Sequence, residues 1–413
     1  MDILKKENRF YLISMLIAVA ACILWVALVK TVPYSDFDYY YSLAKSIADG
    51  GNFGDTYTSV GYAIVLGYVF MIFGKSILVG EIFNLLLTTI SYFLMYSLLK
   101  KINMSEIKKR MIFLVFIFFP ANIFYNSLLG TEILFTMLLL LITNIYFSNN
   151  KFKYVFVGIL AGAETMIKPG FFVFFFAVFL VEIIKNKKLI KSVLHALIVL
   201  ILTGVVVSPM IYRNTKVVGE FTGVSNNGGI VLYINNNSQN NKGRWMPAAD
   251  VENSIVLTKE YKKANMTEKN HMLSKAAKKW IKSHPGQFIV LGFKRLANVY
   301  FVGDDILFTY NKAGLSQNVQ TKLLVYTNLI RNVIFLIGII AIVAYSISVI
   351  RMLIKRRSDE LDSFSLYALI IFYMFTAMYF ITEGQGRYAF PFIFVVIYFF
   401  VNWRSFFRNP IKH

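Results

Sequence analysis

The chain has 413 residues, 57% of them hydrophobic, and a mean hydropathy of +0.58. A soluble globule cannot bury this much apolar side chain, so the composition predicts an all-α polytopic membrane protein. The net charge of +21 comes from 43 Lys and Arg against 22 Asp and Glu. The basic residues gather between apolar runs, as the positive-inside rule requires of a membrane protein. We therefore expect the lipid bilayer as a partner and no nucleic acid.

About ten transmembrane helices are predicted, because a helix needs roughly 20 apolar residues to cross a bilayer. The segments are 10–30, 77–99, 111–127, 132–148, 154–167, 169–184, 192–212, 332–350, 363–382 and 388–404. The first has no cleavage motif after it and is interpreted as a retained helix rather than a signal peptide. It holds Cys22, the single cysteine, so a cysteine-based metal site or disulfide framework is excluded.

The stretch 60–73 is apolar but only about 20 Å long as a helix, which is short for a bilayer core. If it lies on the outer surface, the basic clusters that follow it all fall on the cytoplasmic side. These clusters are Lys100, Lys101, Lys108, Lys109 and Arg110, then Lys151 and Lys153, then Lys185, Lys187, Lys188 and Lys191, and finally Arg351, Lys355, Arg356 and Arg357. We therefore predict an interfacial or re-entrant helix here, cytoplasmic N- and C-termini, and a multi-pass location in the cell (plasma) membrane.

Three regions follow from this topology. Residues 1–212 form a transmembrane module whose first outer loop, 31–76, carries two juxtamembrane helices. Residues 213–331 form a smaller, mostly helical outer domain: a loop to about Pro247, then a helix opened by Thr267-Glu268. Residues 332–413 hold the last transmembrane helices.

Asp36 and Asp38 lie just beyond the first apolar run, where carboxylates are costly unless water, a partner or a substrate meets them. Such a carboxylate could deprotonate an acceptor as it attacks a sugar carbon. The alternative is that Ser35 or Asp36 simply caps the following helix. The pair also offers oxygen ligands for a divalent cation, while the scattered histidines have no metal-ligand spacing.

Lys168, Arg213 and Arg387 are basic residues at predicted outer membrane boundaries. The phosphate of a polyprenyl-phosphate donor needs such cations, although terminal Lys and Arg also snorkel toward headgroups. Glu132 begins a predicted helix, where the dipole favours a carboxylate. The chain has no G-x-x-x-x-G-K-[ST] or G-x-G-x-x-G motif, and the absence of a nucleotide site favours a lipid-linked donor.

Five stretches resemble the GT-C membrane glycosyltransferases, specifically the bacterial relatives of the protein O-mannosyltransferases and aminoarabinose transferases (glycosyltransferase family 39-like). They are Ser35-Asp36 followed by Tyr40 and Gly50, Gly61-Tyr62 through Phe73-Gly74, Pro120 and Asn122 with Thr131-Glu132, Pro209 through Asn214 and on to Asn235, and Gly386-Arg387-Tyr388-Ala389-Phe390-Pro391.

The resemblance implies Asp36 as the catalytic base, with Asp38 as the alternative, because Phe37 separates two acids that the family often has adjacent. Tyr40, Glu132 and Tyr388 are further site candidates. The family commonly has prolines ahead of its second juxtamembrane helix, whereas this chain reads Thr58-Ser59-Val60, so donor-side contacts there differ.

The resulting hypothesis is an inverting glycosyltransferase of the EC 2.4 class. It moves a sugar from a polyprenyl-phosphate donor to an envelope acceptor (protein, glycan or lipid) on the outer face. One alternative is a lipid-linked saccharide transporter, in which the same acids form an ion relay, and another is a glycan ligase or polymerase. No cofactor is required by a motif, and a divalent cation stays open.

Overall fold

The computed structural model describes residues 5 and 8–408, and these are helical throughout, joined by loops and short 3₁₀ segments. The α-helices of the first half are α1 (Arg9–Leu28), α2 (Asp36–Ala48), α3 (Gly61–Phe73), α4 (Ile77–Lys101), α5 (Glu106–Ile117), α6 (Pro120–Phe124), α7 (Thr131–Tyr146), α8 (Lys153–Ile167), α9 (Phe174–Asn186) and α10 (Leu189–Val218). The second half contains α11 (Gly228–Asn235), α12 (Lys259–Lys263), α13 (Met266–Ser283), α14 (Pro285–Phe301), α15 (Gln317–Ile354), α16 (Ser363–Ile381), α17 (Ile393–Val401) and α18 (Trp403–Arg408). The 3₁₀ segments are η3 (Tyr125–Ser127), η4 (Pro169–Val173), η5 (Ala248–Asp250), η6 (Ile255–Leu257), η7 (Asp304–Tyr310), η8 (Ser358–Glu360) and η9 (Gly386–Phe392).

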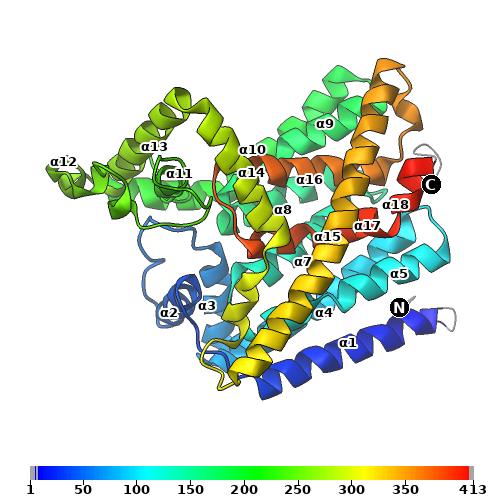
Figure 1. Cartoon of the computed structure of the whole chain (residues 1–413), viewed down its shortest axis with the longest axis horizontal. Coiled ribbons are helices and arrows are strands. Elements are labelled where there is room, and N and C mark those ends of the chain that lie inside the picture. Colours follow the sequence, from blue (N-terminus) through cyan, green and yellow to red (C-terminus); the bar gives the residue numbers. More distant parts are fainter. Residues whose placement is uncertain (1–4, 6–7, 409–413) are drawn as a thin grey trace.

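The long helices form a bundle with distinct ends (Figure 1). Helices α11, α12 and α13 project at one end, with α2 and α3 beside them, while α5 and α18 lie toward the other end. The start of α1 lies at the same end as α18. The prediction of cytoplasmic N- and C-termini concerns residues 1–4 and 409–413, which lie outside the described part of the chain.

Six helices in the described part are long and apolar enough to cross a membrane: α1, α4, α10, α15, α16 and the η4–α9 segment Pro169–Asn186. The expected number was about ten. The other four predicted spans are helical but short or interrupted: α5 with α6 and η3, α7, α8, and η9 with α17. A 16-residue helix such as α7 extends about 24 Å, less than the roughly 30 Å of a bilayer core, so apolar composition overstated their length.

The interruption after α5 is stabilised by buried amides. Backbone groups released from a helix in apolar surroundings need partners within the protein. Asn122 donates to the Phe116 carbonyl at 2.6 Å, and Asn84 of α4 donates to the Leu128 carbonyl at 2.9 Å. These side chains replace the hydrogen bonds that a continuous helix would have made.

The predicted helix at 60–73 is α3, and it packs against α2 through Gly67, which lies close to Ala44 and Ile47. The loop before α3 is joined to the end of α8, because Ser59 Oγ donates to the Ile167 carbonyl at 2.7 Å. Both helices of the first loop are therefore held against the bundle at the end of α8.

The second half differs from the prediction at its helix ends. Helix α15 begins at Gln317 rather than near residue 332. Its first turns are polar, so hydropathy does not detect them as part of the helix. The segment expected as loop up to Pro247 contains α11. The predicted helix at Thr267 is α13, which begins one residue earlier with a capping box between Asn265 and Glu268.

Gly61→Ala tests the packing of α3 on α8. A Cβ at Gly61 would lie 2.5 Å from the Met166 carbonyl oxygen, so α3 must shift. We expect a loss of about 1–3 kcal/mol in unfolding free energy, seen as a lower thermal midpoint of the purified protein. Gly204→Ala in α10 is the control, because no heavy atom lies within 4 Å of its Cβ. Equal midpoints for the two variants would contradict the packing.

Candidate active site

Asp36 is the first residue of α2, and its side chain is 53% exposed. Its Oδ2 accepts a hydrogen bond from Arg387 Nη2 at 2.7 Å. The capping interpretation is wrong for Ser35, which precedes the helix with φ 54° and makes no side-chain cap. The carboxylate of Asp36 is directed to an arginine from the far end of the chain.

Arg387 lies in η9, just after the loop that follows α16, and its side chain is 10% exposed. Its guanidinium lies 5.1 Å from the Phe37 ring centroid, and its Nε donates to Gln385 Oε1 at 2.9 Å. No hydrogen bond of Nη1 is found among the described residues, so this edge of the fork is open to another acceptor. Hydrogen bonds of Nη2 and Nε therefore fix the Arg387 guanidinium, while Nη1 has no hydrogen bond to the described residues.

Lys168 lies between α8 and η4, where Pro169 prevents the first helix from continuing. Its Nζ lies 3.7 Å from Glu132 Oε1 at the start of α7, and 5.3 Å from the ring centroid of Tyr388. The Arg387 guanidinium lies 5.7 Å from the same ring. Two of the three predicted cations therefore flank one tyrosine.

The Tyr388 hydroxyl donates to Glu383 Oε2 at 2.8 Å, and Gln385 Nε2 donates to Glu383 Oε1 at 2.7 Å. The short polar segment Glu383–Arg387, between two apolar helices, is therefore held together by hydrogen bonds among its own side chains and Tyr388. Tyr40 lies on α2, one turn after Asp36, and both burial and the negative charge of Asp36 raise the pKa of its hydroxyl. That hydroxyl stays protonated at neutral pH.

Arg213 and Asp38 are not brought to this site. The guanidinium of Arg213 donates to the backbone carbonyls of Gly54 and Asp55, the latter at 3.2 Å, so it fixes the first loop. Asp38 is exposed, and its carboxylate has no hydrogen bond or ion pair within the described chain. The structure thus separates Asp36 from Asp38 by their partners.

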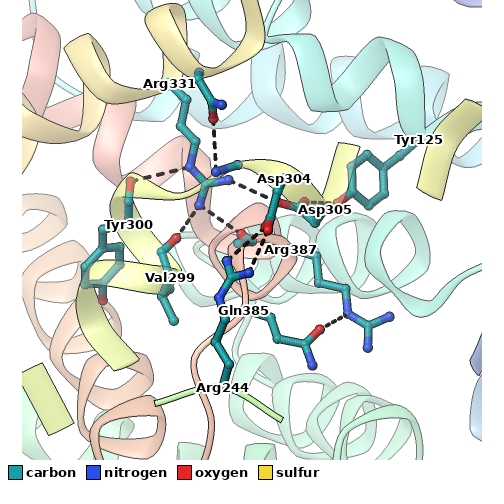
Figure 2. Close-up of polar contacts among 12 residues, drawn as sticks. Tyr125, Arg244, Val299, Tyr300, Asp304, Asp305, Arg331, Gln385 and Arg387 are labelled. Carbon is teal, nitrogen blue, oxygen red and sulfur yellow. Dashed lines mark hydrogen bonds and ion pairs between the residues drawn. The ribbon is translucent and has the colours of Figure 1, made fainter. Parts of the chain in front are cut away.

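Sequence reasoning missed a second polar cluster, which Figure 2 shows together with Gln385 and Arg387. Arg331 of α15 lies 3.6 Å from Asp305 Oδ1, and the Tyr125 hydroxyl donates to Asp305 Oδ2. The neighbouring Asp304 pairs with Arg244 through two hydrogen bonds of 2.6 and 2.9 Å. The one sequence signal for this cluster was the acidic pair Asp304-Asp305, which lies between apolar runs.

The donor set at Asp36 does not fit a metal ion. The Arg387 guanidinium occupies one carboxylate oxygen of Asp36, and its positive charge would repel a divalent cation there. No group of three or more His, Cys, Asp or Glu side chains suited to a metal is found in the part of the chain that the structure describes.

No protein-family model and no curated protein sequence matches the chain. Among solved structures, it is similar to the oligosaccharyltransferase AglB of the archaeon Archaeoglobus fulgidus. The complex of that enzyme with Zn and sulfate matches 96% of this chain and 48% of its own, with TM-score 0.54 and 14% identity. The complex with an inhibitory peptide and a dolichol-phosphate matches 97% of this chain and 50% of its own, with TM-score 0.53 and 12% identity.

The chain therefore spans about half the length of these structures and shares their fold over nearly its whole described length. It has the GT-C fold of membrane glycosyltransferases. The all-α, multi-pass membrane fold predicted from sequence is therefore confirmed.

Glu132→Gln tests whether Glu132 controls the charge of Lys168. Burial lowers the pKa of Lys168, as does the charge of Arg387, whereas Glu132 raises it. Removing that carboxylate lowers the pKa of Lys168 further, so the ammonium loses its proton at lower pH. We expect the alkaline limit of the protonated Lys168 ammonium, followed by the pH dependence of its labelling with an amine-reactive reagent in detergent, to move to lower pH. Asp55→Asn, which removes an acid that does not act on Lys168, is the control, and an unmoved limit in the Glu132 variant would contradict this.

Proposed function

We propose that the chain is an inverting glycosyltransferase that takes a sugar from a polyprenyl-phosphate donor, with Asp36 as the general base. The acceptor hydroxyl or amine attacks the anomeric carbon from the face opposite the phosphate. A bond forms between the acceptor atom and this carbon, and the bond from carbon to phosphate oxygen breaks. The acceptor proton passes to Asp36, and polyprenyl phosphate departs with the electron pair.

The pairing of Asp36 with Arg387 is the observation that carries this proposal. A carboxylate and a cation thus belong to one site, and transfer from a phosphate donor uses a base at the acceptor and a cation at the departing phosphate. Arg387 binds only one oxygen of Asp36, and half of the Asp36 side chain is exposed. The carboxylate is thereby oriented while an acceptor can still reach it.

Arg387 and Lys168 supply the positive charge for the departing phosphate. Both flank Tyr388, and both are largely shielded from water, with 10% and 25% of their side chains exposed. Charges fixed in a water-poor site stabilise a developing anion more strongly than solvated ones. Arg387 can also bind phosphate through its unoccupied Nη1 edge.

The fold supports the class of donor. The structure of AglB, which shares the fold, has been solved in complex with a dolichol-phosphate, and dolichol is a polyprenyl alcohol. The absence of a nucleotide-binding motif in this sequence agrees with a lipid-linked donor. We further propose kinship with the glycosyltransferase family 39-like enzymes, on the Asp36 loop and the Arg387-Tyr388 element, with an envelope protein, glycan or lipid as acceptor.

We propose that the site faces the outer side of the cell (plasma) membrane. In Figure 1, α2 and α3 lie at the end of the bundle opposite α18. The lysine and arginine clusters that follow α4 and α15 then lie on the cytoplasmic side, as the positive-inside rule requires. In this arrangement residues 1–212 and 332–413 form the membrane part, and residues 213–331 hold the outer domain.

Asp36→Asn and Asp38→Asn separate the two acids. We expect sugar transfer from a polyprenyl-phosphate donor to fall at least about 100-fold in the Asp36 variant, because the base is lost. The Asp38 variant should keep most of the activity, since the Asp38 carboxylate has no hydrogen-bond or ion-pair partner among the described residues. Both proteins must first show the thermal midpoint of the wild type. Full activity in both variants would reject the mechanism, and loss in the Asp38 variant alone would transfer the role of base to Asp38.

Chelation tests the metal-free mechanism. Because Arg387 already occupies Asp36, we expect excess EDTA to leave the rate of sugar transfer unchanged in the purified enzyme. The measurement compares rates before and after chelation, with added Mg²⁺, Mn²⁺ and Zn²⁺ as separate arms. A rate abolished by EDTA and restored by one of these ions would show that the cation has a place in the site.

A further inference from the structure

We propose that Arg331 is a positioning residue that fixes Arg387 through the carbonyl of Gly386. This inference rests on the proposed function, in which Arg387 meets the base and the donor phosphate. Within the described part of the chain, Arg331 makes no hydrogen bond or ion pair with Asp36 or with the Arg387 side chain. It acts on the backbone one residue before Arg387.

The guanidinium of Arg331 binds three backbone carbonyls from two segments (Figure 2). Its Nη2 donates to the Gly386 carbonyl at 2.9 Å and also to the Val299 carbonyl, and its Nε donates to the Tyr300 carbonyl at 3.4 Å. Val299 and Tyr300 belong to the last turn of α14. One rigid planar side chain therefore joins the end of α14 to the start of η9.

The charge of Arg331 is held in place by Asp305. Arg331 is 6% exposed and Asp305 is 7% exposed, so each would be costly to bury without the other. Asp305 also accepts a hydrogen bond from Tyr125, which closes the cluster on the opposite side. The guanidinium is thereby prevented from turning away from the Gly386 carbonyl.

Fixing this carbonyl sets the direction of Arg387. The peptide unit is planar, so a carbonyl held at Gly386 also fixes the N–H and Cα of the next residue. The close approach requires glycine, because a Cβ at residue 386 would overlap Asp305 Oδ1 and the Val302 carbonyl. The Arg387 side chain then starts from a defined point and reaches Asp36.

A double-variant cycle tests this route of action. Arg331→Lys leaves the charge but gives up the planar fork that joins three carbonyls. We expect the kcat/KM for donor to fall roughly tenfold, since small displacements of catalytic groups cost this much or more. In the Arg387→Gln background the same change should cost less than about twofold, because the residue being positioned is gone. Additive losses in the two backgrounds would overturn the proposal.

Hydrogen exchange tests the placement without relying on activity. In full-length Arg331→Lys protein, amide exchange in the 383–392 segment should be about tenfold faster than in wild type, since a charge-assisted hydrogen bond has been lost. Arg244→Gln is the matched control: it removes another arginine of Figure 2, one that binds Asp304 and not Gly386, and should leave this segment unchanged.

Unchanged exchange in the Arg331 variant would overturn the proposal, whatever the substrate. Faster exchange of equal size in both variants would also overturn it, because the effect would then belong to the whole cluster. Faster exchange in the Arg331 variant alone, in a protein whose wild type transfers no sugar, would support the placement of Arg387 and reject the proposed function separately.

Discussion

The ion pair between Asp36 and Arg387 joins two residues 351 positions apart, and the rest of the membrane part is arranged so that they meet. It requires the start of α2 to lie against η9. The pair adds little to stability, because half of the Asp36 side chain is exposed to solvent. Its consequence is geometric: a largely buried guanidinium and an accessible carboxylate occupy one place in a fixed orientation.

Sequence reasoning selected Asp36, Arg387 and Lys168 as candidates but did not show how they pair. These three residues were selected because a charge at a membrane boundary costs free energy unless water, a partner or a substrate meets it. Composition and spacing do not show which acid meets which cation, and so Asp36 and Asp38 could not be separated. Only the packing of α2 against η9 gives Arg387 to Asp36 and leaves Asp38 exposed.

Two other misjudgements have one cause, which is that hydropathy locates apolar segments and not helix ends. Helix α10 continues through Pro209 to Val218, and from its last turns Arg213 reaches the backbone of the first loop. Helix α15 starts at Gln317, so Arg331 lies well inside it rather than at a boundary. Because the predicted outer domain ended at residue 331, Arg331 gave no signal of its role inside a buried helix.

The four segments that are too short to span explain where the site lies. Glu132 lies in the first turn of α7, Lys168 follows α8, Arg387 lies in η9, and Tyr125 follows α6. Irregular backbone at membrane depth is tolerated where it is buried in protein or lines a cavity. A helix that ends early can present a polar side chain at that depth, which a continuous spanning helix would direct into lipid or a neighbour. The shortness of these helices is therefore a condition for bringing Glu132, Lys168 and Arg387 together around Tyr388.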